Sequence, residues 1–147
     1  MQQKIVACAC IYQKVGTNVK ILVTKRSLNA DFLPGVYEIP GGHIDPGEEL
    51  ITGLRREIRE ELNIEIEVGE LISAFTFVHK DSHTIEVVYL ATTPNHTNIK
   101  IQEEEIDSYT WISEKDVESL IGSNKPTDDQ EVPILKNAFD ILNKSTK

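Results

Sequence analysis

The chain has 147 residues, of which 39% are hydrophobic and 27% charged, and its formal net charge is −9. This length favours one domain over residues 1–147 with a substantial hydrophobic core. The acidic balance argues against long nucleic acid as a partner, although a bound Mg²⁺ could supply the positive charge that a phosphate needs. No apolar run reaches 18 residues, so we expect a cytoplasmic protein that does not span a membrane. Cys8 and Cys10 lie in one apolar run and indicate buried free thiols.

The chain begins with a predicted β-hairpin. Residues 5–12 are apolar on both faces, which is typical of a central strand covered on both sides. Residues 19–24 form the second strand, after a turn that contains Gly16. Lys25 and Arg26 follow at the strand end, where they are either phosphate contacts or ordinary surface bases.

A glycine-rich segment comes next. Residues 36–39 are predicted to be extended and to lead into a turn that contains Gly41 and Gly42. Glycine tolerates positive φ and lets backbone come close to a ligand, so we expect one of these uses here. His43 follows directly and is expected to face a substrate.

A helix predicted over residues 48–62 carries an unusual cluster of carboxylates. On a helical wheel, Glu57, Glu60 and Glu61 share an arc of roughly 100° that borders the apolar side. The alternative is a solvated acidic face. However, clustered like charges repel, and the simplest chemical role for such a cluster is to bind Mg²⁺, which prefers oxygen ligands. The apolar side consists of Leu50, Leu54, Ile58 and Leu62.

Other residues of this helix support a specialised role. Arg56 lies near the acidic arc and could hold a carboxylate in a bidentate grip, whereas Arg55 and Arg59 lie on the far side. Gly53 falls inside the arc, at a cost of about 1 kcal/mol relative to Ala, which indicates clearance for metal and phosphate. Asn63 is predicted to end the helix as a left-handed C-cap.

The rest of the chain predicts more strands and two helices. Strands are expected over residues 64–68, 71–78, 85–92, 99–102 and 109–112. Helices are expected over residues 114–121, capped by Ser113 with Asp116, and from Asp128 or Asp129 to Asn143. Strands on both sides of the acidic helix, followed by a terminal helix, predict an α/β sandwich on a mixed sheet.

The segment from Gly42 to Ile64 resembles the signature of the Nudix hydrolase family, which spaces a glycine, an Arg-Glu pair and a Glu-Glu pair over 23 residues. One position departs, since Asn63 stands where the family usually has glycine, and asparagine is the next best residue for left-handed geometry. The resemblance implies a Nudix-like α/β/α sandwich with a mixed β-sheet and the catalytic loop-helix packed on it. The matching residues are Gly42, Glu48, Arg56, Glu57, Ile58, Glu60, Glu61 and Ile64.

The resemblance also implies hydrolysis of a nucleoside diphosphate linked to another moiety, with Mg²⁺ or Mn²⁺. Glu57 and Glu61 would be the main metal ligands. Glu60 would lie alongside them, and a backbone carbonyl of the Gly41-Gly42 segment would be a further ligand.

The remaining roles carried over by position are those of orientation and proton transfer. Arg56 would orient the glutamates, and Glu48 would support Arg56. The general base would come from the signature helix or from a later glutamate, and Glu103, Glu104 and Glu105 are the candidates. A solvated acidic run is the alternative for two of these three residues.

The substrate class follows from the family alone. A nucleoside triphosphate, including oxidised forms, is expected, cleaved to a monophosphate and pyrophosphate. The alternatives are ADP-ribose, nucleotide sugars and dinucleoside polyphosphates or, in another class, a non-catalytic nucleotide-binding regulatory module; RNA-end processing is disfavoured by the acidic charge. A homodimer is compatible with the sequence, which indicates no interface. The expected substrate contacts are Lys25, Arg26, Gly41, Gly42 and His43.

Overall fold

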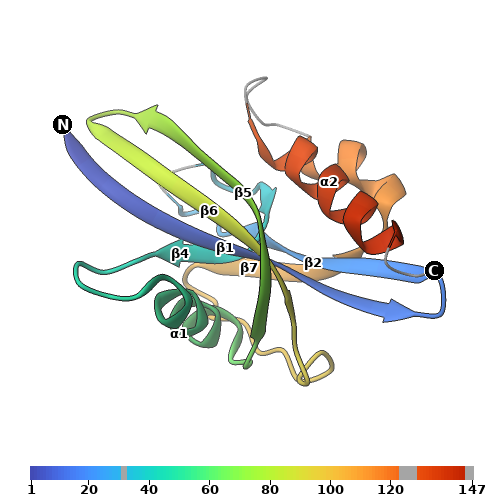
Figure 1. The fold of residues 1–147 in the computed structure, drawn as a ribbon. Helices are drawn as coiled ribbons and strands as arrows, with labels where there is room; N and C mark the ends of the chain where they lie inside the picture. The colour runs from blue at the N-terminus through green and yellow to red at the C-terminus, as the bar shows by residue number, and fades with distance from the viewer. Residues whose placement is uncertain (31–32, 123–128, 145–147) are drawn as a thin grey trace.

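A mixed β-sheet lies between two helical layers in the computed structural model, which describes residues 1–30, 33–122 and 129–144 (Figure 1). The strands are β1 (Gln2–Val15), β2 (Asn18–Arg26), β3 (Tyr37–Glu38), β4 (Gly41–His43), β5 (Glu67–His79), β6 (Ser82–Thr92) and β7 (Ile106–Ile112). The helices are α1 (Leu50–Leu62) and α2 (Glu131–Lys144), with the short turns η1 (Glu114–Asp116) and η2 (Val117–Ile121) before α2.

Strand β1 organises the sheet. It pairs in parallel with β6 along one edge, and the strand order is β3-β2-β1-β6-β5. With 14 residues, β1 is long enough to pair with two strands on its other edge. Residues 6–8 pair with β4, and residues 12–15 pair with β2. The glycines of β4 therefore lie against the middle of β1, and the predicted mixed sheet is confirmed.

Alternating side chains of β1 serve two separate cores, as its apolar character on both faces predicted. Ala7, Ala9 and Ile11 belong to the cluster under α1, whereas Cys8 and Cys10 belong to the cluster under α2. Both thiols are free and buried, and burial raises the pKa of Cys10 to about 12.

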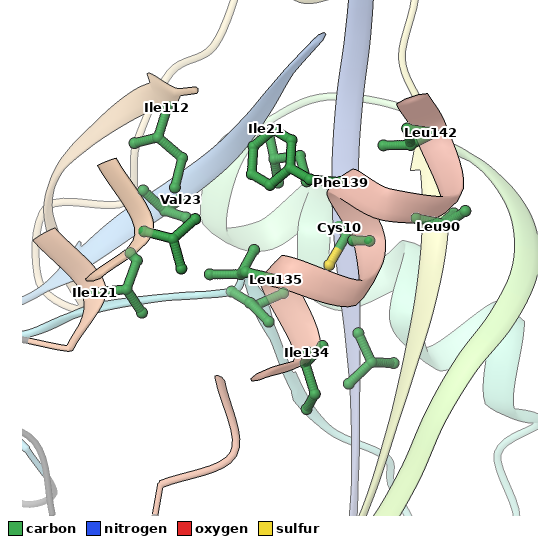
Figure 2. Close-up of a cluster of buried hydrophobic side chains, with 14 of the residues drawn as sticks. Cys10, Ile21, Val23, Leu90, Ile112, Ile121, Ile134, Leu135, Phe139 and Leu142 are labelled. Carbon is green, nitrogen blue, oxygen red and sulfur yellow. The ribbon is translucent and has the colours of Figure 1, made fainter. Parts of the chain in front are cut away.

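The second core closes the sandwich. Leu135 and Phe139 on α2 pack with Cys10 and Ile21 of the sheet (Figure 2). Because α1 covers the opposite face (Figure 1), the predicted α/β/α arrangement is confirmed. No helix in the described ranges is long and apolar enough to cross a membrane.

The strand predicted over residues 99–102 is wrong, because this segment caps the end of α1 instead. The Lys100 N–H donates to the Leu62 carbonyl at 3.0 Å. The Gln102 N–H donates to the Glu61 carbonyl at 2.8 Å. The last carbonyls of a helix have no partner within the helix, so they bind these N–H groups in place of a neighbouring strand.

The C-terminal region follows its predictions in part. The helix predicted over residues 114–121 is a 3₁₀ turn followed by a π turn. The Ser113 cap is confirmed, since its N–H donates to the Asp116 carboxylate at 3.0 Å. At the start of α2, the Glu131 N–H donates to the Asp129 carboxylate at 2.9 Å, whereas Asp128 lies outside the described residues.

One continuous strand, β5, replaces the two strands predicted over residues 64–68 and 71–78. Its register to β6 shifts between Val68 and Leu71 and again between Leu71 and Ser73. The expected break at the intervening glycine is therefore absorbed as a bulge rather than as a loop. From Ser73 to its end, β5 pairs one-to-one with β6.

Candidate active site

The two glycines before α1 provide close packing. Gly41 and Gly42 form strand β4 rather than a turn, and neither has a positive φ. A Cβ on Gly41 would overlap the Ala7 carbonyl of β1, and one on Gly42 would overlap the Glu57 carboxylate. The expectation of positive φ is therefore wrong, and the close approach seen here is to other parts of the chain, while approach to a ligand stays a prediction. Gly42 faces α1 with Ala7, so the Glu57 carboxylate fills the space beside it.

The ends of α1 set the positions of its acidic side chains. The helix begins at Leu50, two residues later than predicted, and Glu49 caps it by accepting two N–H groups of the first turn. Glu48 lies before the helix, and its carboxylate binds Arg56. Asn63 ends the helix with φ of 55°, which confirms the predicted left-handed C-cap.

Arg56 joins the loop and the helix through five hydrogen bonds. Its Nε and Nη2 donate to the two carboxylate oxygens of Glu48 at 2.7 and 2.9 Å, which is the predicted bidentate grip. Its Nη1 donates to Glu57 and to Glu60, each at 3.1 Å. Its Nη2 also donates to the His43 carbonyl at 3.1 Å. These bonds lower the pKa of Glu48 to about 2 and restrict where the other carboxylates can lie.

Gly53 has a different use from the predicted one. A Cβ at this position would lie 2.7 Å from Glu48 Oε1 and 2.7 Å from Ile44 Cδ1. The clearance that the helical wheel assigned to metal and phosphate is therefore occupied by the side chain that holds Arg56. The wheel placed Gly53 correctly on the acidic side, but it could not show which group approaches.

Four carboxylates interact at one end of α1, and we call Glu38, Glu57, Glu61 and Glu105 the acidic site. Glu61 is partly buried, and its desolvation, followed by the charges of the other three, raises its pKa to about 9. Desolvation also raises the pKa of Glu57, and the charge of Glu105 adds to this effect. The predicted ligand Glu60 lies on the outer flank with a 59% exposed side chain.

The acidic run after β6 contributes one residue to this site. Glu105 raises the pKa of both Glu57 and Glu61, so its carboxylate lies within their electrostatic reach. All three glutamates of the run are exposed, but only the charge of Glu105 is among the main causes of the raised pKa of Glu57 and of Glu61. Of the three candidate bases, the structure therefore brings Glu105 to the acidic helix.

Glu38 was missed as a site residue. It lies on β3, and its carboxylate accepts two hydrogen bonds from Arg26 Nη1, at 2.9 and 3.1 Å. It also raises the pKa of Glu61, which is far from it in the sequence. A usable signal was its place in the segment Tyr37-Glu38-Ile39-Pro40-Gly41, which leads directly into the signature glycine Gly42.

The predicted substrate-binding bases separate into two groups. Arg26 binds Glu38 and its charge acts on Glu61, so Arg26 lies at the acidic site. His43 is connected to the site through its backbone carbonyl, which accepts from Arg56 at 3.1 Å. Desolvation, followed by the charges of Lys4 and Arg26, lowers the pKa of the His43 side chain. Lys25 instead lies 3.9 Å from the Asp107 carboxylate on β7. The structure therefore brings Arg26, of the three predicted basic side chains, to the carboxylates.

The acidic site fits a hard divalent cation in its chemistry. Its donors are carboxylate oxygens, and desolvation with the charges of the neighbouring carboxylates raises the pKa of Glu61 more than Arg26 lowers it. Within residues 1–30, 33–122 and 129–144, no three His, Cys, Asp or Glu groups form a ready coordination shell. One oxygen of Glu57 and one of Glu60 accept from Arg56, so a cation would be held by the other oxygen of each carboxylate.

Comparisons with known proteins agree with the fold and the signature. The nucleoside triphosphatase NudI of Escherichia coli strain K12 is 29% identical over 126 residues, which cover 80% of this chain and 86% of NudI. The solution structure of the E. coli ORF135 protein has a TM-score of 0.70 at 27% identity, over 99% of this chain and 94% of that one. The Caenorhabditis elegans Ap4A hydrolase complex has a TM-score of 0.78 at 20% identity, and the match covers 96% of this chain and 98% of that one. This likeness shows the shared fold.

The family model for the NUDIX domain matches residues 1–135, so this chain belongs to the Nudix hydrolase family.

Proposed function

We propose that this chain is a divalent-cation-dependent pyrophosphohydrolase that cleaves a nucleoside triphosphate to a monophosphate and pyrophosphate. The observation that carries this proposal is the acidic site, where the partly buried Glu61 interacts with three further carboxylates. Clustering of this kind is costly unless a cation balances the charge. The name of the relative NudI, a nucleoside triphosphatase, supports the substrate class.

The roles in metal binding follow from the positions of these residues in the family signature. Glu57 and Glu61 would hold Mg²⁺ or Mn²⁺, with Glu60 and the Gly42 carbonyl as further ligands. A cation held there would supply positive charge for the diphosphate and lower the pKa of water. Arg56 positions Glu57 and Glu60 through its hydrogen bonds at 3.1 Å, and Glu48 holds Arg56.

The reaction is an attack of water on phosphorus. The water oxygen forms a bond to phosphorus, the bridging bond between the α- and β-phosphates breaks, and pyrophosphate leaves. Glu105 accepts the proton of the attacking water, because it is the glutamate of its run that lies in reach of the acidic site. Arg26 and His43 contact the phosphate oxygens, whereas Lys25 is a weaker candidate because of its ion pair with Asp107.

Metal-dependent hydrolysis in matched glutamine variants tests the assignment. Glu57→Gln and Glu61→Gln should each lower kcat/KM by about 100-fold or more, since each removes a charged metal ligand. Glu104→Gln is the control, because Glu104 is exposed and belongs to the same run as the proposed base. If Glu61→Gln retains full activity, or the wild type works without a divalent cation, the metal assignment is wrong.

A substrate panel with Mg²⁺ tests the substrate class. It should contain canonical and oxidised nucleoside triphosphates, ADP-ribose, nucleotide sugars and dinucleoside polyphosphates. The highest kcat/KM for a triphosphate supports the proposal, and a preference for another compound reassigns the substrate. No turnover of any compound would favour the regulatory nucleotide-binding module instead.

A further inference from the structure

The outer edge of β5 is open to pairing with another strand. β5 is the last strand in the sheet order, and none of the described loops or turns hydrogen-bonds to the backbone of residues 70–78. The segment from Leu71 to Val78 contains neither a charged residue nor a proline. Proteins usually protect a long edge strand with charges, prolines or a covering element. This edge therefore has the properties of an interface.

Both faces of the strand carry apolar side chains next to this edge. Phe75 and Phe77 lie on one face, with their ring centroids 6.2 Å apart. Leu71 and Val78 are 50% and 59% exposed, which is high for large apolar residues.

The pairing of β5 with β6 fixes which side chains lie on which face. Ala74 pairs with Val87 of the α1 core, so Ala74 and Thr76 lie on the α1 side of the sheet. Phe75 and Phe77 alternate with them and lie on the α2 side. Ala74 and Thr76 are both exposed.

We propose that β5 pairs in antiparallel fashion with β5 of a second copy of this chain, around a two-fold axis at Phe75. An antiparallel strand pair of this kind is self-complementary, as a symmetric dimer requires. In this register Phe75 lies opposite its own counterpart, and Ala74 lies opposite Thr76 of the second copy. The two sheets join into one, and each copy keeps α1 on the same side.

The chemistry along the strand favours a second copy as the occupant. On the α2 side, Phe75 and Phe77 of both copies form one row of aromatic rings, which is a favourable cross-strand arrangement. On the α1 side, the bulge before Ser73 advances the strand by one residue and brings Leu71 beside Val78 of the second copy. The most exposed apolar side chains of the strand thus cover each other.

The ends of the pairing carry opposite charges. Glu70 of one copy comes to the end of the strand where Lys80 of the second copy lies. The charge-free segment between them avoids direct repulsion, although each copy has a net charge of −9. The interface is short, so we expect a dissociation constant on the order of micromolar, lowered by added salt because salt screens the net repulsion.

Sedimentation velocity on the full chain, from about 1 μM to about 500 μM, tests the interface. In the double variant A74E/T76E, each introduced glutamate faces a glutamate of the second copy. The dissociation constant should rise about tenfold or more, since like charges directly opposite are destabilising. In A74E/T76K, each glutamate faces a lysine, and the dissociation constant should return to within about threefold of the wild type.

Two controls separate pairing from other effects. A74E/T76K carries as many charged substitutions as A74E/T76E, so both lose the same exposed Ala74 and Thr76 contacts. T97E/N98E adds the same net charge in an exposed loop between β6 and β7, and it should dimerise like the wild type. Circular dichroism and thermal melting establish that each variant is folded.

Three outcomes would overturn the proposal, and none depends on the proposed hydrolysis. The first is a wild type that stays monomeric over the whole concentration range. The second is an A74E/T76E variant that dimerises as tightly as the wild type. The third is an A74E/T76K variant that dimerises as weakly as A74E/T76E, because opposite charges restore the dimer if Ala74 faces Thr76 across the axis.

Discussion

Gly42 and Glu57 are packed so closely that residue 42 has no room for a side chain. A Cβ at Gly42 would overlap the Glu57 carboxylate, because β4 places this glycine on the side of β1 that faces α1. The glycine of the signature therefore protects the position of a proposed metal ligand. This relationship joins the strand before α1 to the chemistry on the helix.

Gly42→Ala should lower kcat/KM by about 100-fold, because Glu57 must move to make room and displacements of this kind are costly in an active site. Nucleotide hydrolysis with Mg²⁺ measures the effect. Gly16→Ala is the matched control, since Gly16 lies in the β1–β2 turn with nothing within 4 Å of an added Cβ. That control costs some stability, because Gly16 has a φ of 64°, but it should leave activity unchanged. Equal activity of Gly42→Ala and the wild type would contradict this role.

Arg56→Lys should lower kcat/KM by about 10- to 100-fold, because a lysine cannot reproduce five hydrogen bonds in fixed directions. Arg59→Lys on the same helix is the control. Arg59 binds Glu65 at 2.7 and 2.9 Å, away from the acidic site, and its replacement should change activity little. Similar losses in the two variants would contradict a specific role for the hydrogen-bond geometry at Arg56.

Asn63→Gly should stabilise the protein by about 0.5 to 1 kcal/mol, whereas Asn63→Ala should destabilise it by about 1 kcal/mol. The reason is the left-handed backbone at Asn63, with φ of 55° and ψ of 38°. Glycine adopts this conformation without strain, and alanine does not. Urea unfolding of the three proteins measures the order, and an alanine variant as stable as the glycine variant would rule out the cap as the cause.

Glu61→Gln should stabilise the metal-free protein at alkaline pH. Burial and neighbouring carboxylates raise the pKa of Glu61 to about 9, whereas an unfolded chain ionises near the ordinary value of 4.5. Because this pKa is raised in the folded state, the contribution of Glu61 to stability is fully present at low pH and is lost as pH rises from about 4.5 to about 9. The free energy of unfolding in EDTA should therefore decrease less in the variant than in the wild type as pH rises. The difference between the two decreases should be about 2 kcal/mol between pH 5 and pH 9, measured by thermal unfolding.

Added Mg²⁺ provides the second half of this prediction. It should raise the melting temperature of the wild type, because a ligand that binds the folded state stabilises it. Glu61→Gln should lose most of this increase. Glu104→Gln serves as the control and should respond to Mg²⁺ like the wild type. An equal Mg²⁺ response in the two glutamine variants would place the cation away from Glu61.

Features of α1 were predictable because they depend on local geometry. Helical periodicity alone placed Glu57 and Glu61 beside the core face and Arg56 near them. The left-handed preference of asparagine similarly predicted the cap at Asn63. Errors occurred where a second segment of the chain decided the outcome, as at Gly53, whose space is taken by Glu48.

The sequence by itself determined the family, the layered fold and the helix that carries the glutamates, because these follow from residue spacing over short stretches. Only the tertiary structure selected Glu105 from its acidic run and brought Glu38 to Glu61. It also showed that Gly42 makes room for Glu57. These relationships join residues on β3, β4, α1 and the segment before β7, and the distances between them depend on strand pairing across the whole chain.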